Sequence, residues 1–240
     1  MVGKPAAKAM FWDFDGTLTY ADNLWSNAVL DTYRYFMGED SLTLYDIRPL
    51  MWRGYTWDKP YDEKRMLKGE AWWEFTCGML AERFTVLGAP LEKVQEMAEY
   101  AKKLLLCTEK FHIYEDAPEV LASCIERGYR NYIVSNHYPE LPQLVEKLGL
   151  AKYFSGYAVS SELGIDKPRP EIFEYAKELA GNPEICYMVG DNPHADIKGA
   201  ESVGIPAILV HREPKGEPKR TARNLREVLQ LIDKEQIPAL

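Results

Sequence analysis

The sequence predicts an α/β fold, a doubly wound parallel β-sheet with a helical domain inserted after its first strand. From residue 115 onward, short apolar runs alternate with amphipathic segments of helical length. This alternation is typical of βαβ units, whose helices cover both faces of a parallel sheet. An earlier apolar run at residues 9–12 is followed by a mostly helical stretch that is longer than one crossover needs.

The strands of the sheet are expected at the apolar runs, residues 9–12, 129–134, 157–159, 185–189 and 207–210. The helices between them are expected at residues 116–128, 139–149, 170–181 and 193–204. Each of these helices has a proline near its start and a glycine at its end, the asymmetry expected of helix termini. An exposed loop at residues 211–219 and an outer helix at residues 221–232 complete the prediction.

The stretch between residues 17 and 115 is predicted to be an inserted helical cap. Candidate helices lie at residues 22–37, 69–87 and 91–106. Five of the six tryptophans fall in this stretch, namely Trp25, Trp52, Trp57, Trp72 and Trp73. Because aromatic residues at helical spacing usually form a core, we expect most of them to form the small core of the cap.

Composition and charge limit the possible partners. The 240 residues carry a formal net charge of -8, with a pI near 5.2, so neither nucleic acid nor an anionic membrane is an expected partner. Residues 1–9 lack the apolar core of a signal peptide, and no apolar run is long enough to span a bilayer. The four cysteines lie far apart, which favours free thiols in a reducing cytoplasm over disulfides or a metal cluster. We therefore expect a cytoplasmic protein, and its oligomeric state is not predicted.

Two carboxylates, Asp13 and Asp15, follow the first apolar run directly. In a strand, residues i and i+2 project from the same face, so both acids can reach one reacting centre. Two carboxylates are costly to hold close together unless a cation or a shared proton relieves their repulsion. The pair therefore suggests a metal-dependent active site, although calcium loops, structural turns and the acidic pockets of receiver domains contain the same pattern.

Polar residues also follow the later strands. Ser135 and Asn136 follow the second expected strand, Lys167 lies after the third, and Asp191 follows the fourth. In doubly wound sheets, ligands bind outside the carboxyl ends of the strands. Each residue alone has a structural explanation, as a helix cap, a solvated lysine or a turn. All of them in this order at successive strand ends favour a functional site.

Together these residues resemble the four motifs of the haloacid dehalogenase-like (HAD) superfamily. The motifs are Asp13-Phe14-Asp15-Gly16-Thr17, Ser135, Lys167-Pro168, and Gly190-Asp191 with Asp196. The segments at residues 167–173 and 190–200 are especially similar to the family pattern, and the helical insertion resembles the C1-type cap of subfamily I. The resemblance implies a Rossmann-like core at residues 1–18 and 110–240 and a helical cap at residues 19–109.

By this resemblance the chain is a Mg²⁺-dependent phosphatase of a small phosphorylated metabolite. Asp13 is then the nucleophile that forms an aspartyl-phosphate, and Asp15 is the general acid and later the general base. The implied Mg²⁺ ligands are Asp13, the backbone carbonyl of Asp15, and Asp191, a small carboxylate set that suits this ion.

The resemblance also implies the groups that bind phosphate. They are Phe14, Asp15, Thr17, Ser135, Asn136 and Lys167, with Ser135 and the backbone N–H groups near Phe14 and Asn136 donating to phosphoryl oxygens. Lys167 neutralises the charge on the nucleophile and the phosphoryl group. Asp196 is expected to orient Lys167 or metal-bound water. Thr17 is expected to stabilise the turn and orient Asp15, and Gly16 permits its sharp geometry.

Other activities of the superfamily stay open. A sugar-phosphate mutase uses the same four motifs, and a phosphonoacetaldehyde hydrolase uses a cap lysine, for which Lys59, Lys64 and Lys68 are available. Dehalogenation is disfavoured because that branch lacks the second aspartate. A non-catalytic phospho-accepting or phosphate-binding module is the alternative from another class, although a receiver domain needs no cap and a silent module is expected to have lost a motif.

Specificity is expected in the cap, where the loop at residues 53–61 mixes aromatic and cationic side chains. Arg48, Arg53 and Trp57 are candidates to contact the leaving group, and cap closure is expected to exclude water in the first step. His137, directly after the second motif, could face the site, but a loop histidine with a structural role is the preferred interpretation.

Overall fold

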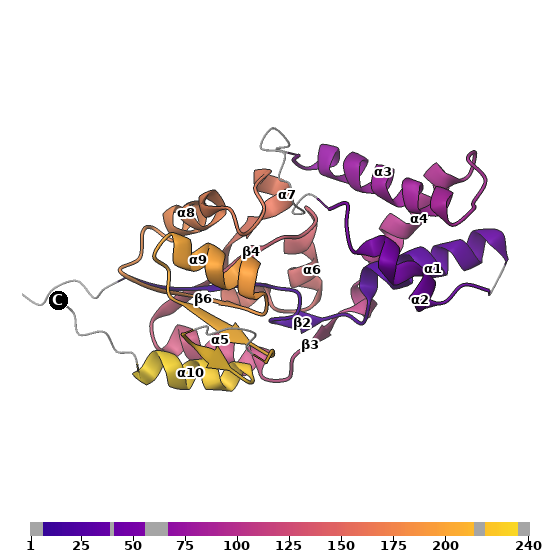
Figure 1. The fold of residues 1–240 in the computed structure, drawn as a ribbon. Helices are drawn as coiled ribbons and strands as arrows, with labels where there is room; N and C mark the ends of the chain where they lie inside the picture. The colour runs from indigo at the N-terminus through magenta and orange to yellow at the C-terminus, as the bar shows by residue number, and fades with distance from the viewer. Residues whose placement is uncertain (1–6, 39–40, 56–66, 214–218, 235–240) are drawn as a thin grey trace, which may run out of the picture. The chain divides into compact units, whose positions relative to one another are not determined.

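The computed structural model describes residues 7–38, 41–55, 67–213 and 219–234, which form two compact units. The first unit comprises Met1–Tyr20 and His112–Leu240, and the second comprises Ala21–Phe111. The first unit contains a six-stranded sheet in which every strand pairing is parallel, with helices on both faces (Figure 1). The predicted doubly wound sheet is therefore confirmed.

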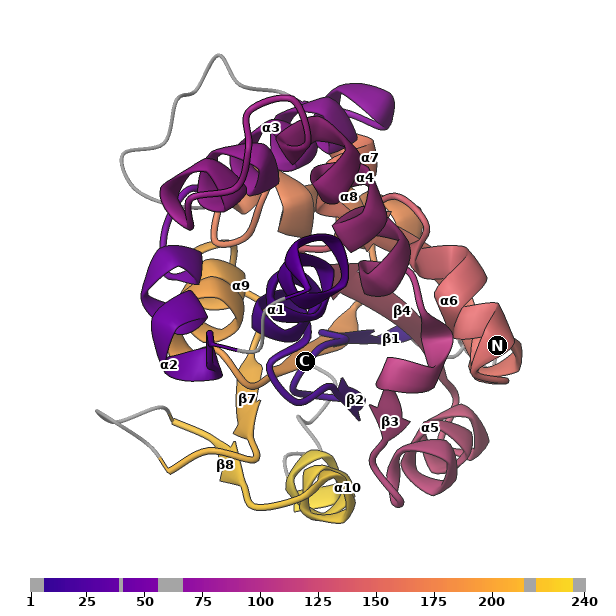
Figure 2. The same cartoon turned by 90° about the vertical axis from the view of Figure 1, so that its right-hand side faces the viewer.

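The strand order is β5-β4-β1-β6-β7-β8, and Figure 2 shows the last of these strands at the edge beyond β7. The bounds are β1 Lys8–Trp12, β4 Tyr129–Ser135, β5 Phe154–Val159, β6 Ile185–Gly190, β7 Ala207–Val210 and β8 Thr221–Ala222. The central strand β1 pairs with β4 on one side and with β6 on the other. The chain thus winds in both directions from β1, and ligands of such sheets bind at this switch point.

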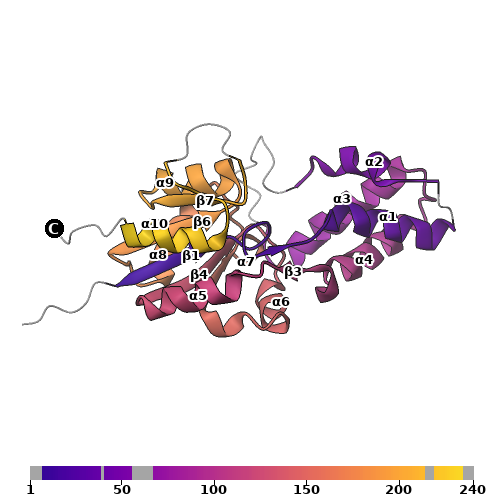
Figure 3. The same ribbon diagram turned by 90° about the horizontal axis from the view of Figure 1, so that it is seen from below.

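Helices cover the sheet in two layers. Helix α8 (Pro170–Leu179), the π-helical turn η4 (Pro193–Lys198) and α9 (Gly199–Ser202) lie over one face, whereas α5 (Ala117–Glu126) and α10 (Leu225–Lys234) lie over the other (Figures 1 and 3). The core under α8 takes alternate residues from the strands, namely Ala9, Phe11, Tyr132, Val134 and Met188. Alternation follows from the period of two along a strand, and it explains why runs such as residues 9–12 are apolar throughout. The short helices of this unit are α6 (Leu141–Lys147), α7 (Ser160–Leu163) and η3 (Ala151–Tyr153).

Two predicted helices differ from their expected form. The outer helix begins at Leu225, and Thr221–Ala222 form the edge strand β8 instead of a first helical turn. The helix expected at residues 193–204 opens with the wide turn η4, because the carbonyl oxygen of Asn192 accepts hydrogen bonds from the N–H groups of both Asp196 (3.0 Å) and Ile197 (3.3 Å).

The second unit is helical. Its elements are α1 (Leu24–Met37), α2 (Leu44–Ile47), η1 (Arg48–Met51), α3 (Glu70–Val86), α4 (Val94–Leu105) and η2 (Thr108–Lys110). Within this unit α4 packs against both α1 and α3 (Figure 3). Trp72 and Trp73 are buried in its core, whereas Trp52 is exposed, and Trp57 lies outside the described residues.

The chain leaves and re-enters the first unit through a short antiparallel ribbon. Strand β2 (Thr19–Tyr20) pairs with β3 (His112–Ile113), so Thr19 lies opposite Ile113. Among the described residues, no helix has the length and apolar character needed to cross a membrane. The four cysteines are free thiols, as expected.

A buried carboxylate joins α5 to α10. Asp116, which directly precedes α5, is 6% exposed, and its Oδ2 accepts hydrogen bonds from the backbone N–H groups of Leu225 (2.9 Å) and Arg226 (3.2 Å). These donors belong to the first turn of α10, where N–H groups lack partners within the helix and a negative charge is favourable. Asp116 therefore acts as the N-terminal cap of a helix that is distant in sequence.

We predict that Asp116→Ala lowers the free energy of unfolding by about 1–2 kcal/mol, because the buried N–H of Leu225 and the partly buried N–H of Arg226 lose their acceptor. Urea unfolding followed by circular dichroism measures this change. Glu119→Ala is the matched control: its side chain pairs with Arg226 at the surface, and its loss is expected to have little effect. Equal destabilisation by the two variants would contradict the capping role.

Candidate active site

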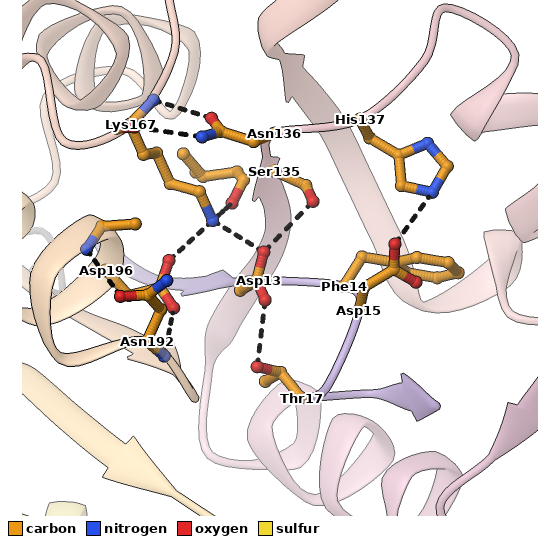
Figure 4. A network of polar contacts seen from close by, with 12 residues as sticks. Asp13, Phe14, Asp15, Thr17, Ser135, Asn136, His137, Lys167, Asn192 and Asp196 are labelled. Carbon is orange, nitrogen blue, oxygen red and sulfur yellow. Dashed lines mark hydrogen bonds and ion pairs between the residues drawn. The ribbon is translucent and has the colours of Figure 1, made fainter. Parts of the chain in front are cut away.

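The carboxyl ends of three neighbouring strands bring the motif residues together (Figure 4). Asp13 follows β1, Ser135 is the last residue of β4, and Asp191 follows β6. Lys167 comes from the loop between α7 and α8. Because these strands are adjacent and parallel, side chains distant in sequence meet at one edge of the sheet.

Asp13 is the centre of the resulting network. Its Oδ1 accepts hydrogen bonds from Lys167 Nζ (2.6 Å) and Ser135 Oγ (3.1 Å), and its Oδ2 accepts one from Thr17 Oγ1 (3.2 Å). The backbone N–H of Asp13 continues the sheet by donating to the carbonyl of Val189 (2.9 Å). The side chain is buried, and its two oxygens are held from different sides.

Lys167 is a buried cation whose three ammonium protons all have acceptors. It donates to Asp13 Oδ1, to Asp196 Oδ1 (2.7 Å) and to the carbonyl of Val134 (2.8 Å). Burial disfavours the charged form, but the carboxylates of Asp13 and Asp196 outweigh this cost and raise the pKa of Lys167. The ammonium therefore remains charged at neutral pH, and it lies where it offsets the charge of Asp13.

The loop that carries Lys167 is joined to β4 by Asn136. The backbone N–H of Lys167 donates to Asn136 Oδ1 (2.7 Å), and Asn136 Nδ2 donates to the carbonyl of Lys167 (3.0 Å). The side chain of Asn136 thus positions the lysine. The group expected at Asn136 to bind phosphate is its backbone N–H.

Two glycines permit the close approach of the motif loops. Gly16 has φ +83°, and a Cβ at this position would lie 2.6 Å from Oδ2 of Asp191. A side chain at Gly190 would overlap the carboxyl group of Asp196. Both positions therefore need glycine, Gly16 for its backbone conformation as well as for space.

Asp15 lies at the open side of the network, with 45% of its side chain exposed. Its Oδ1 accepts a hydrogen bond from Thr19 Oγ1 (3.4 Å). The expected role of Thr17 is corrected here: the hydroxyl of Thr17 contacts Asp13, and Thr19 is the threonine that contacts Asp15. Desolvation by the dense surroundings and the nearby charge of Asp13 raise the pKa of Asp15 to about 7, although one side of the carboxyl faces solvent.

His137 faces the site, in contrast to the loop role preferred from sequence. Its ring is buried, and Nε2 lies 3.4 Å from Oδ2 of Asp15 (Figure 4). Burial lowers the pKa of His137 to about 4, so the imidazole is neutral at pH 7. Its position directly after Asn136 was the signal in the sequence, but a single histidine in a loop could not show where its ring points.

The carboxylates of Asp13, Asp191 and Asp196 fit a divalent cation. They are buried, and one oxygen from each lies within 4.8 Å of the others. Asp196 already uses Oδ1 for Lys167 and Oδ2 for the N–H of Asn192 (2.9 Å), so Asp13 and Asp191 are the better ligands. Burial and the charge of Asp13 raise the pKa of Asp191, which indicates repulsion that a cation would relieve. A few carboxylates at one open site suit Mg²⁺.

Arg212, like Thr19, is a residue of this region that sequence reasoning missed. Its Nε and Nη2 donate to Oδ2 of Asp191 at 2.7 and 2.5 Å, and its side chain is 60% exposed. Its only signal was its place two residues after β7, at the same edge of the sheet as the other strand ends.

The residues expected to set specificity belong to the second unit. Arg48 donates to Oδ1 of Asn23, and the carbonyl of Arg53 accepts a hydrogen bond from Arg83 (2.8 Å). Trp57, Lys59 and Lys64 lie outside the described residues.

Several known proteins are similar to this chain in sequence. A family model described as haloacid dehalogenase-like hydrolase matches residues 7–204. The phosphoserine phosphatase of Thermus thermophilus is 37% identical over 150 residues, which cover 59% of this chain and 58% of that protein. The pyrimidine 5'-nucleotidase YjjG of Escherichia coli is 39% identical over 122 residues, which cover 48% of this chain and 54% of that protein. The chain thus aligns with a little over half of the length of these curated relatives.

Solved structures extend the similarity over the whole fold. The HAD-hydrolase YfnB of Bacillus subtilis, bound to magnesium, matches with a TM-score of 0.71 and 18% identity, covering 95% of this chain and 99% of that one. A HAD phosphatase from Thermococcus onnurineus matches with a TM-score of 0.64 and 21% identity, covering 96% and 100% of the two chains. At these identities the likeness concerns the fold alone.

We predict that Mg²⁺ raises the melting temperature of the protein by about 5–10 °C at a hundredfold excess over its Kd, because it relieves the repulsion between Asp13 and Asp191. Differential scanning fluorimetry with Mg²⁺ or EDTA measures the shift. In Asp191→Asn the shift is expected to be mostly lost. A full shift in that variant would show that Mg²⁺ binds elsewhere.

We also predict that Arg212→Ala strengthens Mg²⁺ binding about fivefold, since a guanidinium near a carboxylate ligand costs an incoming cation about 1 kcal/mol in an exposed setting. Isothermal titration calorimetry measures the Kd directly. Arg223→Ala, which removes an exposed arginine paired with Glu227, is the control for a change in net charge. Weaker binding in Arg212→Ala would instead mean that Arg212 orients Asp191 for the metal.

Proposed function

The chain belongs to the haloacid dehalogenase-like hydrolase family, and from this membership and the geometry of its site we propose that it is a Mg²⁺-dependent phosphatase. The proposed substrate is a small phosphate monoester, which reacts through an aspartyl-phosphate on Asp13. The observation that carries the proposal is the arrangement of Asp13: a buried carboxylate between Lys167 and Ser135, with a second acid two residues later.

In the first step, a carboxylate oxygen of Asp13 attacks phosphorus and the ester P–O bond breaks. The bonding electrons leave with the ester oxygen, which takes a proton from Asp15 and departs as an alcohol. A pKa of about 7 allows Asp15 to carry that proton at neutral pH. Lys167 and Ser135 orient the nucleophile through the hydrogen bonds to its Oδ1.

In the second step, water attacks the phosphorus of the aspartyl-phosphate. Asp15, now a carboxylate, accepts a proton from this water, and the carboxylate of Asp13 is released together with inorganic phosphate. When bound, Mg²⁺ supplies positive charge that lowers the repulsion between the phosphoryl group and Asp13. Lys167 remains charged throughout and offsets the negative charge at Asp13.

The relatives support a small phosphate ester as the substrate class. They include a phosphoserine phosphatase, a pyrimidine 5'-nucleotidase and a glyceraldehyde 3-phosphate phosphatase, the last 34% identical over 110 residues. Their substrates differ in the leaving group and share the phosphate monoester. Phosphoserine, pyrimidine nucleoside 5'-monophosphates and glyceraldehyde 3-phosphate are therefore the first compounds to test.

We predict Mg²⁺-dependent phosphate release from at least one of these esters, and a loss of more than about 10⁴-fold in Asp13→Asn, because a neutral amide cannot attack phosphorus as the carboxylate does. A phosphate-release assay with Mg²⁺ or EDTA measures it. Asp22→Asn, a carboxylate variant in the second unit, controls for the substitution itself.

Other outcomes separate the alternatives. No release from any phosphate ester would contradict the phosphatase proposal and direct the assay to phosphonoacetaldehyde and to phosphoryl transfer between sugar phosphates. Full activity in Asp13→Asn would remove Asp13 from the mechanism.

A further inference from the structure

The carboxyl group of Asp15 has a different neighbour at each oxygen. Thr19 Oγ1 donates to Oδ1, and Nε2 of His137 lies 3.4 Å from Oδ2. Figure 4 shows the imidazole ring directed at this carboxyl from the segment after β4. Thr19 comes from the turn that contains Asp15 itself, whereas His137 comes from a different strand end and so adds a constraint that the turn alone lacks.

The ring of His137 is itself fixed. Its side chain is 2% exposed, and its Nδ1 lies 3.4 Å from the carbonyl oxygen of Tyr138. The backbone N–H of His137 donates to Ser160 Oγ (3.2 Å), and its ring makes a T-shaped contact with Phe14 at a centroid distance of 5.7 Å. A buried ring with these contacts has one orientation, so the position of Nε2 is set by the surrounding fold.

We propose that His137 is a positioning residue that keeps the carboxyl group of Asp15 directed at the leaving-group oxygen. This inference rests on the proposed function, in which Asp15 gives a proton to that oxygen as the ester P–O bond breaks. Asp15 is nearly half exposed, and an exposed carboxyl group otherwise samples several rotamers. Restricting it to one geometry matters because small displacements of an acid from its substrate cost rate.

The two ring nitrogens of His137 give a matched pair of variants. In His137→Gln the side-chain amide lies near the position of Nε2, which faces Asp15. In His137→Asn the amide lies near the position of Nδ1, which faces Tyr138. If His137 acts through Asp15, the glutamine variant keeps activity and the asparagine variant loses it. If His137 instead packs the loop through Tyr138, the asparagine variant keeps activity and the glutamine variant loses it. His137→Leu removes both polar contacts.

The leaving group provides the readout. An alkoxide needs a proton as it leaves, whereas p-nitrophenolate is stable enough at neutral pH to leave without one. We therefore expect kcat/KM for an alkyl phosphate to fall about 10- to 100-fold in His137→Asn and His137→Leu, with His137→Gln within about threefold of wild type. For p-nitrophenyl phosphate, kcat/KM is expected to change less than about threefold in all three variants.

Two results would overturn the inference. Equal losses with both substrates would mean general damage to the site, and rescue by asparagine instead of glutamine would mean a structural role. Thermal melting of each variant shows whether it is folded.

A structural readout keeps the inference testable if the wild-type protein releases phosphate from no ester, the outcome that contradicts the proposed function. Crystal structures of the wild type and of His137→Leu then show whether His137 positions the Asp15 side chain. A changed or disordered Asp15 side chain in the variant supports positioning by His137. An unchanged Asp15 conformation would reject it.

Discussion

The site depends on one electrostatic constraint: carboxylates buried at a single edge of the sheet must be compensated by a buried cation. Lys167 supplies it, with every ammonium proton bonded, two of them to carboxylates. Removing one partner of such a buried arrangement leaves an uncompensated charge, which is strongly unfavourable. The features around the network serve this compensation. Asn136 places the lysine backbone, glycine at position 190 leaves room for Asp196, and the widened turn after Asn192 directs the Asp196 carboxylate toward the ammonium.

On the open side of the site, the negative charge of the carboxylates is only partly compensated. Asp191 shares one oxygen with the exposed guanidinium of Arg212, and Asp15 keeps part of its surface in solvent. Full neutralisation of these carboxylates would weaken the binding of a divalent cation, and it would remove the part of the Asp15 pKa shift that the charge of Asp13 adds to desolvation. The buried half therefore fixes the geometry of the site, and the exposed half keeps the charge that the proposed cation binding and proton transfer need.

Much of this arrangement could be predicted from the sequence, for a specific reason. Apolar runs end abruptly at Trp12, Val134 and Val189, so the residues that follow them must meet at the edge of a parallel sheet. What could not be predicted depends on side-chain direction. The alternation of side-chain direction in a strand does not continue into the turn that follows it. The sequence therefore could not predict that Thr17 contacts Asp13 and that Thr19 contacts Asp15. Arg212 and the ring of His137 reach the site only through tertiary packing, which leaves no local pattern in the chain.

The ribbon of β2 and β3 has a consequence for how this chain can change over evolution. Because Thr19 lies opposite Ile113, the pairing of β2 with β3 holds the two ends of the second unit next to each other. This proximity does not depend on contacts within the second unit. The pairing of the two strands thus offsets the entropic cost of bringing the ends of the inserted segment together. This cost grows only slowly with the length of the inserted segment. Helices can be lengthened, shortened or exchanged between these two points without shifting the register of the central strands. The inserted segment is therefore free to diversify, while the residues that surround Asp13 stay under the constraints of the sheet.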